Sequence, residues 1–118
     1  MCGDFKFFEK RFWVWRGNFK LFFSLGRFLA DSFIGNNDYI YITIDLDGFS
    51  SAFTPGVSAP SPIGMNPKFV MSLLEFILSS KKVISCDIAE MNPNFDQDNS
   101  TANLAARLID HIVGRLEV

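Results

Sequence analysis

The chain is organised around residues 39–65, which read YIYITIDLDGFSSAFTPGVSAPSPIGM. Residues 39–44 are all β-branched or aromatic, a composition that favours a β-strand. Because they are almost continuously apolar, we expect a central strand of a parallel sheet, covered on both faces. Asp45 and Asp47 follow this strand, and the loop over 48–64 is rich in proline and glycine. A loop this long inside a compact domain is usually functional or disordered. Because the strand ends in two aspartates, we expect it to deliver a carboxylate pair to an edge of the sheet, where a metal could bind.

The rest of the chain alternates between helical and strand patterns. Asn66 is suited to cap one helix and Pro67 to its first turn, while Asn99 or Ser100 is expected to cap the last helix. The expected elements are a helix over 21–33, a strand over 39–44, a helix over 67–78, a strand over 83–89 and a helix from 101 to about 116. This order predicts an α/β fold with a parallel sheet and right-handed crossovers.

Three carboxylates follow the two expected strands. Asp45 and Asp47 come after the first strand, and Glu90 comes after the second. Parallel strands have their carboxyl ends at one edge, where ligands bind in open α/β sheets. Like charges gathered there repel one another unless a cation joins them, which points to a metal ion or a guanidinium-like ligand. Carboxylate oxygens suit hard divalent ions such as Mn²⁺ and Mg²⁺.

The pattern Asp45-x-Asp47 has a second interpretation, in which the pair is structural or solvated. Both carboxylates can serve one site if the strand ends at Asp45 and the chain then bends, which Gly48 makes easy. Phe49 and Phe53 indicate that the following loop is packed rather than loose.

Other polar and reactive residues receive structural interpretations. We expect His111 at a helix surface or boundary, Cys86 as a small buried hydrophobe, and Asp96 and Asp98 as solvated loop residues. Asp87 has two open interpretations, a group that supports the site and an inward polar residue of the strand.

Residues 1–35 form an aromatic-rich segment that we treat separately from residues 36–118. Nine of the fourteen phenylalanines and both tryptophans lie before residue 35, many at helical spacing. The favoured interpretation is a helical segment that faces a core. The alternatives are a basic amphipathic helix over residues 5–23 on a membrane surface, and a segment that is not native to the domain.

Composition limits the classes of function. A chain of 118 residues holds one domain or part of one, and an apolar fraction of 48% suits a globular core. A net charge of −2 gives no electrostatic basis for binding nucleic acid. The two cysteines, Cys2 and Cys86, favour a reduced, cytoplasmic setting. Charged residues interrupt the apolar start, so we expect neither a membrane-spanning helix nor a signal peptide.

Four blocks of sequence, in order, resemble a known family. They are TIDLD at 43–47, AFTPGVSAP at 52–60, DIAEMNP at 87–93 and LAARL at 104–108. Together they resemble the arginase (ureohydrolase) family, and within it the formimidoylglutamase branch. The resemblance covers roughly residues 36–117.

The resemblance implies a partial three-layer α/β/α fold and a hydrolase of linear amidines. Asp45 and Asp47 would be ligands of a binuclear Mn²⁺ centre, and Glu90 would face the cationic amidine or guanidino group of a small substrate. The substrate implied is formimidoylglutamate, an intermediate of histidine degradation. Paired divalent ions lower the pKa of a shared water and so provide hydroxide at neutral pH.

Two features depart from the family pattern. The family supplies histidine ligands upstream, yet nothing in residues 1–38 matches those segments and His111 is the single histidine. Ser50 stands where many relatives have an aspartate. We therefore expect the C-terminal portion of a longer enzyme, inactive by itself. The alternative is a non-catalytic fragment that serves as a protein-interaction or membrane-surface module. Homo-oligomer formation is left open.

Overall fold

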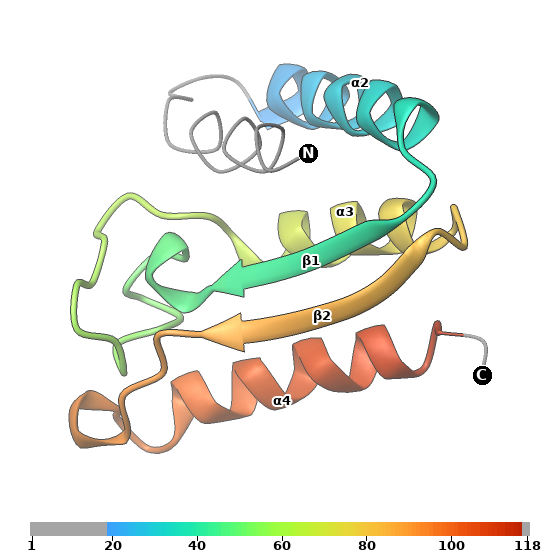
Figure 1. Cartoon of the computed structure of the whole chain (residues 1–118). Coiled ribbons are helices and arrows are strands. Elements are labelled where there is room, and N and C mark those ends of the chain that lie inside the picture. Colours follow the sequence, from blue (N-terminus) through green and yellow to red (C-terminus); the bar gives the residue numbers. More distant parts are fainter. Residues whose placement is uncertain (1–18, 117–118) are drawn as a thin grey trace.

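The structure is a computed structural model that describes residues 19–116, with side chains described from residue 28 onward. Figure 1 shows helices and strands alternating along the chain. They are α2 (Phe19–Asn36), β1 (Ile40–Asp45), α3 (Pro67–Leu78), β2 (Val83–Ala89) and α4 (Ser100–Val113). Short 3₁₀ turns follow the strands at Leu46–Gly48 and Pro93–Phe95. Each expected helix and strand is present, with end points a few residues from those predicted.

β1 and β2 pair in parallel as a two-stranded sheet. The register pairs Ile42 with Cys86, Ile44 with Ile88 and Asp45 with Ala89. Parallel neighbours need a long crossover connection, and α3 supplies it here. The predicted α/β fold with a parallel sheet is confirmed.

Helix α3 forms because its sequence supplies a cap, a first turn and an apolar face. The Asn66 side chain accepts a hydrogen bond from the backbone N–H of Lys68 at 2.9 Å, and Pro67 occupies the first turn, as predicted. The buried face consists of Phe69, Val70, Leu73, Leu74, Ile77 and Leu78. These positions recur every three or four residues, so one side of the helix enters the core.

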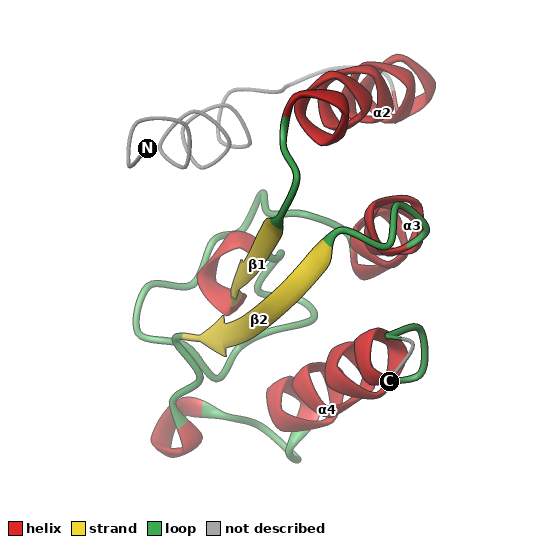
Figure 2. Ribbon diagram, turned by 45° about the vertical axis from the view of Figure 1, so that its right-hand side comes forward, coloured by secondary structure: helices red, strands yellow, loops and turns green. Residues whose placement is uncertain are grey.

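The described helices cover one face of the sheet. Along β1 the side chains of Ile40, Ile42 and Ile44 are buried, whereas those of Tyr41 and Thr43 are exposed. Figure 2 shows α3 and α4 on the same side of the two strands, and α3 contacts both α2 and α4. The prediction that β1 is covered on both faces is therefore not met by residues 19–116.

The open face of the sheet carries a polar cluster. The Tyr41 hydroxyl donates to Oδ2 of Asp87, and the Thr43 hydroxyl donates to Oδ1 of Asp87 at 2.7 Å. Asp87 is exposed, so it is not an inward polar residue of the strand. Its carboxylate instead joins β2 to β1 on the open face of the sheet.

The start of α4 differs from the prediction. Asn99 has a left-handed backbone with φ of 58°, and its side chain makes no capping hydrogen bond. Instead, the Asp96 carboxylate accepts hydrogen bonds from the backbone N–H groups of Thr101 and Ala102, each at 3.0 Å. Asn99 thus occupies the predicted N-cap position, but the predicted side-chain cap is absent, because the acidic side chain of Asp96 folds back over the positive end of the helix dipole. Asp96 is partly exposed, as a solvated loop residue would be, and its hydrogen bonds to the helix were not predicted.

Helix α2 connects the first described residues to the core. Ala30 is 1% exposed and belongs to the core, and Phe33 and Ile34 pack against it. The predicted aromatic stripe, both tryptophans, Cys2 and the proposed membrane-facing residues 5–23 lie outside the residues whose side chains are described. The division between 1–35 and 36–118 stays a prediction. Among the described helices, none has the length and apolarity to cross a membrane.

Leu108 offers a direct test of how α4 packs. Its side chain is 0% exposed in the core, whereas that of Ile109 beside it is 48% exposed. Leu108→Ala should lower the free energy of unfolding by about 2–5 kcal/mol through lost burial and a cavity. Ile109→Ala should change it by less than about 1 kcal/mol. Urea denaturation measures both, and equal losses in the two variants would contradict this packing of α4.

Candidate functional site

The carboxyl ends of both strands and the loops that follow them gather at one edge of the sheet, the arrowhead end in Figure 1. The register places Asp45, the last residue of β1, opposite Ala89, the last residue of β2. Glu90 comes directly after Ala89 and Asp47 comes two residues after Asp45. The two predicted sources of acidic side chains therefore meet at the same edge.

Asp45 and Asp47 lie on a tight turn. The strand ends at Asp45, and Oδ1 of Asp45 accepts a hydrogen bond from the backbone N–H of Asp47 at 2.8 Å. The predicted bend after the strand is present. Its cause is the 3₁₀ turn capped by Asp45, since Gly48 does not have a positive φ.

The Asp47 carboxylate is held in an unfavourable electrostatic position. Its Oδ1 atom is buried and has no hydrogen-bond partner. Burial raises the pKa of Asp47, and the negative charge of Asp45 raises it further, while a hydrogen bond from the backbone of Ala59 lowers it in part. A buried acceptor without a partner costs free energy unless a donor or a cation arrives to satisfy it.

Glu90 has a backbone conformation that is rare for its residue type. Its φ is 72°, in the left-handed region, and its side chain is exposed. Such a conformation costs on the order of 1 kcal/mol and persists when the surrounding structure imposes it. On one side of Glu90, Ala89 pairs with Asp45 in the sheet. On the other side, Asn92 N–H donates a hydrogen bond to the carbonyl of Gly56.

The loop between the aspartate pair and α3 is ordered by its own backbone. Met65 N–H donates to the carbonyl of Gly48 at 2.8 Å, and Ser50 N–H donates to the carbonyl of Met65 at 3.0 Å. Ser51 N–H donates to the carbonyl of Ser61 at 2.7 Å. These bonds close the loop on itself beside the aspartates.

Side chains pack beneath the same loop. Phe49 is fully buried, and the buried Thr54 hydroxyl donates to the carbonyl of Leu46 at 3.0 Å. Gly64 approaches so closely that a Cβ there would lie 2.1 Å from the carbonyl carbon of Phe49. The predicted packing is confirmed for Phe49, but Phe53 is 40% exposed.

A second set of contacts joins this loop to the loop after β2. Gly56 N–H donates to the Thr101 hydroxyl at 2.8 Å, and Asn92 N–H donates to the carbonyl of Gly56 at 2.7 Å. The Asp96 carboxylate accepts hydrogen bonds from the backbone N–H groups of Gln97, Thr101 and Ala102. We call Gly56, Asn92, Asp96 and Thr101 the loop clasp.

The loop clasp keeps Asp96 ionised. Burial would raise the pKa of Asp96, but hydrogen bonds from Thr101, Ala102 and Gln97 outweigh it and lower the pKa from 3.8 to about 2. Sequence reasoning missed Asp96, Thr101 and Gly56 as partners. The available signal was an acidic residue shortly before a helix start, which favours an interaction with the first turn of that helix.

The remaining candidates lie outside this cluster. His111 is on α4, where its Nε2 atom is buried without a hydrogen-bond partner, in keeping with a boundary position. Cys86 is a free thiol packed against the core at partial exposure. Asp98 is exposed in the loop and has a positive φ of 50°.

The carboxylates of Asp45 and Asp47 could hold a metal ion. Within residues 19–116, no group of three or more His, Cys, Asp or Glu side chains gathers as metal ligands. Asp45 and Asp47 are close enough for their charges to interact, and the unpartnered Oδ1 of Asp47 suits a hard cation. The residues present fit two carboxylate positions of a divalent-metal centre.

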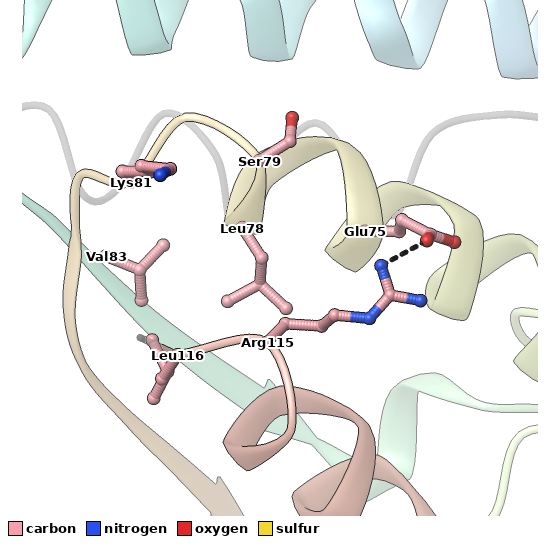
Figure 3. Close-up of a pocket in the computed structure, with 7 residues that line it drawn as sticks. All are labelled: Glu75, Leu78, Ser79, Lys81, Val83, Arg115 and Leu116. Carbon is pink, nitrogen blue, oxygen red and sulfur yellow. Dashed lines mark hydrogen bonds and ion pairs between the residues drawn. The ribbon is translucent and has the colours of Figure 1, made fainter. Parts of the chain in front are cut away.

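The cavity drawn in Figure 3 lies at the other end of the strands. It has a volume of about 450 Å³ and is lined by Glu75, Leu78, Ser79, Lys81, Val83, Arg115 and Leu116. Arg115 Nη1 contacts Oε1 of Glu75 at 2.5 Å, and both side chains are about half exposed, so this ion pair contributes little stability. None of the predicted site residues lines the cavity, so it is separate from the acidic edge.

Comparison with known proteins gives one consistent result. The family model described as Arginase family matches residues 28–114. A formimidoylglutamase of Clostridium tetani (strain Massachusetts / E88) is 52% identical over 83 residues, and one of Staphylococcus aureus (strain MRSA252) is 47% identical over 85 residues. These matches cover 70% and 72% of this chain. The chain spans 25–27% of the length of these relatives.

Solved structures agree with the fold. An arginase from Bacillus subtilis superposes with a TM-score of 0.73 at 23% identity, over 80% of this chain and 35% of that one. The agmatine ureohydrolase of Thermoplasma volcanium superposes with a TM-score of 0.63 at 30% identity, over 74% of this chain and 30% of that one.

Removing the carboxylate charge of Asp47 should stabilise the metal-free protein, because burial and the nearby charge of Asp45 both disfavour that charge. A folded-state pKa above 3.8 favours the protonated form, so this contribution to stability is present below pH 3.8 and is lost as pH rises through the raised pKa. Asp47→Asn should therefore raise the melting temperature of the metal-free protein at pH 7, and this gain should shrink in acid. Asp38→Asn, at an exposed carboxylate, is the control. A lower melting temperature for Asp47→Asn than for Asp38→Asn at pH 7 would rule out this electrostatic account.

Proposed function

The chain belongs to the arginase family, and from this membership we propose that it forms the part of a manganese-dependent ureohydrolase that carries two metal-binding aspartates and one substrate-binding glutamate. In this proposal Asp45 and Asp47 hold Mn²⁺, and Glu90 binds the cationic amidine or guanidino group of a small substrate. In this proposal further metal ligands belong to the remainder of a longer enzyme, since the chain spans 25–27% of the length of its relatives.

The observation that carries the proposal is the unpartnered Oδ1 of Asp47 beside the carboxylate of Asp45. A protein retains such an unfavourable arrangement where function uses it, because a buried acceptor next to a like charge lowers stability otherwise. A divalent cation satisfies the oxygen and reduces the repulsion between the two aspartates at the same time.

The residues of this chain would act by binding and orientation. When bound, the metal ions supply a nucleophilic water at neutral pH and charge stabilisation for the reaction. Asp45 is fixed by the hydrogen bond from Asp47 N–H, so its free carboxylate lone pairs keep one direction. Glu90, held at the strand end, can accept two hydrogen bonds from a planar amidinium, which orients the carbon to be attacked.

For the substrate we propose formimidoylglutamate, and with it a place in histidine degradation in the cytoplasm. The support is that the relatives at 52% and 47% identity are both formimidoylglutamases. The solved neighbours include an arginase and an agmatine ureohydrolase, whose lower identities support the fold more than the substrate.

A chimera tests the function. The segment of the Clostridium tetani formimidoylglutamase that matches this chain is replaced by the corresponding residues of this chain. The chimera should release formamide from N-formimidoyl-L-glutamate when Mn²⁺ is present, and should release less urea from arginine or agmatine.

In the same chimera, Glu90→Gln should lower kcat/KM by roughly tenfold to a hundredfold, as expected for loss of a hydrogen bond to a charged group. Glu75→Gln, at the opposite end of the sheet, is the matched control. A folded chimera without Mn²⁺-dependent hydrolysis would contradict the proposal.

A second candidate function is that of a protein-interaction module. Within residues 19–116, β2 pairs with β1 alone, so the other backbone edge of β2 has no strand beside it. Ile84 on β2 is 67% exposed. An unpaired edge with an exposed apolar side chain is a template for strand addition from another chain.

Oligomeric state and edge substitution test this second candidate. If an edge is an interface, sedimentation should show concentration-dependent association of the purified chain, and Ile84→Lys should weaken it by at least about tenfold, since a charged edge resists strand addition. Ile63→Lys, at an exposed loop position, is the control. A monomer at all concentrations would count against self-association through the edge.

A further inference from the structure

We propose that Asp96 is a positioning residue, which acts through the loop clasp to fix Glu90 relative to Asp45 and Asp47. The roles of those three acidic residues rest on the proposed function, whereas the mechanical link between Asp96 and Glu90 rests on contacts in the described chain.

Three backbone N–H groups donate hydrogen bonds to the Asp96 carboxylate. Its Oδ1 accepts from the backbone N–H groups of Gln97 at 2.9 Å and Thr101 at 3.0 Å, and its Oδ2 accepts from Ala102 N–H at 3.0 Å. These bonds lock the orientation of the carboxylate against the first turn of α4. With a pKa of about 2, it stays ionised across the neutral range and keeps accepting these bonds.

Thr101 links Asp96 to the loop after β1. The Thr101 side chain is 0% exposed, and its hydroxyl oxygen accepts a hydrogen bond from Gly56 N–H at 2.8 Å, while its backbone N–H donates to Asp96 at 3.0 Å. Thr101 therefore joins the Asp96 carboxylate to the loop after β1. A Cβ at Gly56 would lie 2.7 Å from Cβ and 2.9 Å from Cα of Asp96, so the two loops touch with no room for a side chain.

Gly56 is in turn hydrogen-bonded to the segment that contains Glu90. The carbonyl of Gly56 accepts from Asn92 N–H at 2.7 Å, two residues after Glu90. On its other side Glu90 follows Ala89, which pairs with Asp45. Glu90 is thus fastened at both ends, and the left-handed φ of 72° is the conformation that joins these two anchors.

The same anchor also reaches the aspartate pair. Gly56 lies in the loop that brings the backbone N–H of Ala59 to the carboxylate of Asp47. The buried Val57, 2% exposed, fixes the chain between them. One set of hydrogen bonds therefore holds both loops of the acidic edge. A carboxylate that served α4 alone would need no contact with Gly56.

Two matched pairs of variants test the link. Asp96→Asn and Thr101→Val remove the acceptor charge and the hydroxyl of the loop clasp. Asp98→Asn removes a charge from the same loop, and Thr101→Ser keeps the hydroxyl. In the purified chain, residue-resolved hydrogen exchange at pH 7 should accelerate roughly three- to tenfold at the Gly56 and Asn92 amides in the first pair, as expected for lost hydrogen bonds. The β1 amides should keep their rates, and the second pair should match the unsubstituted chain.

The readout at Glu90 separates positioning from simple helix capping. The backbone ¹³C shifts of Glu90 report its left-handed conformation, and they should move toward random-coil values in Asp96→Asn and Thr101→Val. They should stay unchanged in Asp98→Asn and Thr101→Ser. Retention of the Glu90 shifts in both disruptive variants, or equal acceleration of exchange in β1, would overturn the proposal. An inactive chimera would sink the proposed function, while these shifts would still decide whether Asp96 fixes Glu90.

Discussion

Parallel pairing of β1 with β2, in the register that sets Asp45 opposite Ala89, is the constraint on which the rest of the structure depends. It places the ends of two strands at one edge although 44 positions separate the two residues in the sequence. A shift of one residue would turn the isoleucines of β1 from the core to the open face. The core therefore selects the register, and the register brings the ends of the two strands, which the acidic residues follow, to one edge.

The acidic edge is unfavourable for the metal-free protein. A buried carboxylate oxygen without a partner, a neighbouring like charge and a left-handed glutamate each raise the energy of the folded state. They persist because the isoleucine and α3 core, together with the hydrogen bonds of the two loops, holds the backbone around them. Domains commonly tolerate strain at a ligand-binding site because the rest of the core supplies enough stability.

Local chemistry made much of this fold predictable. The β-branched and aromatic run before Asp45 predicted β1, and Asn66 followed by Pro67 predicted the start of α3 because capping depends on neighbouring residues. The acidic residues after both strands could be found because parallel strands end at one edge. The position of Asp96 could not, since its partner loop lies about 40 residues upstream and Gly56 gives no local sign of a contact. The exposure of Tyr41 and Thr43 was missed for a related reason, because a strand's sequence does not state which layers cover it.

Asp45 and Asp47 are proposed to be two carboxylate ligands of a metal site that the rest of a longer enzyme completes. Titration of the chimera with Mn²⁺, followed by the electron paramagnetic resonance signal of the free ion, tests this most directly. We predict saturable binding that Asp47→Asn weakens by at least about tenfold, as loss of a ligand or its support does at metal sites. The chimera with Asp87→Asn, on the open face, should bind like the unsubstituted chimera. Binding that is absent from the folded chimera, or that survives unchanged in Asp47→Asn, would contradict the proposed role of the two aspartates.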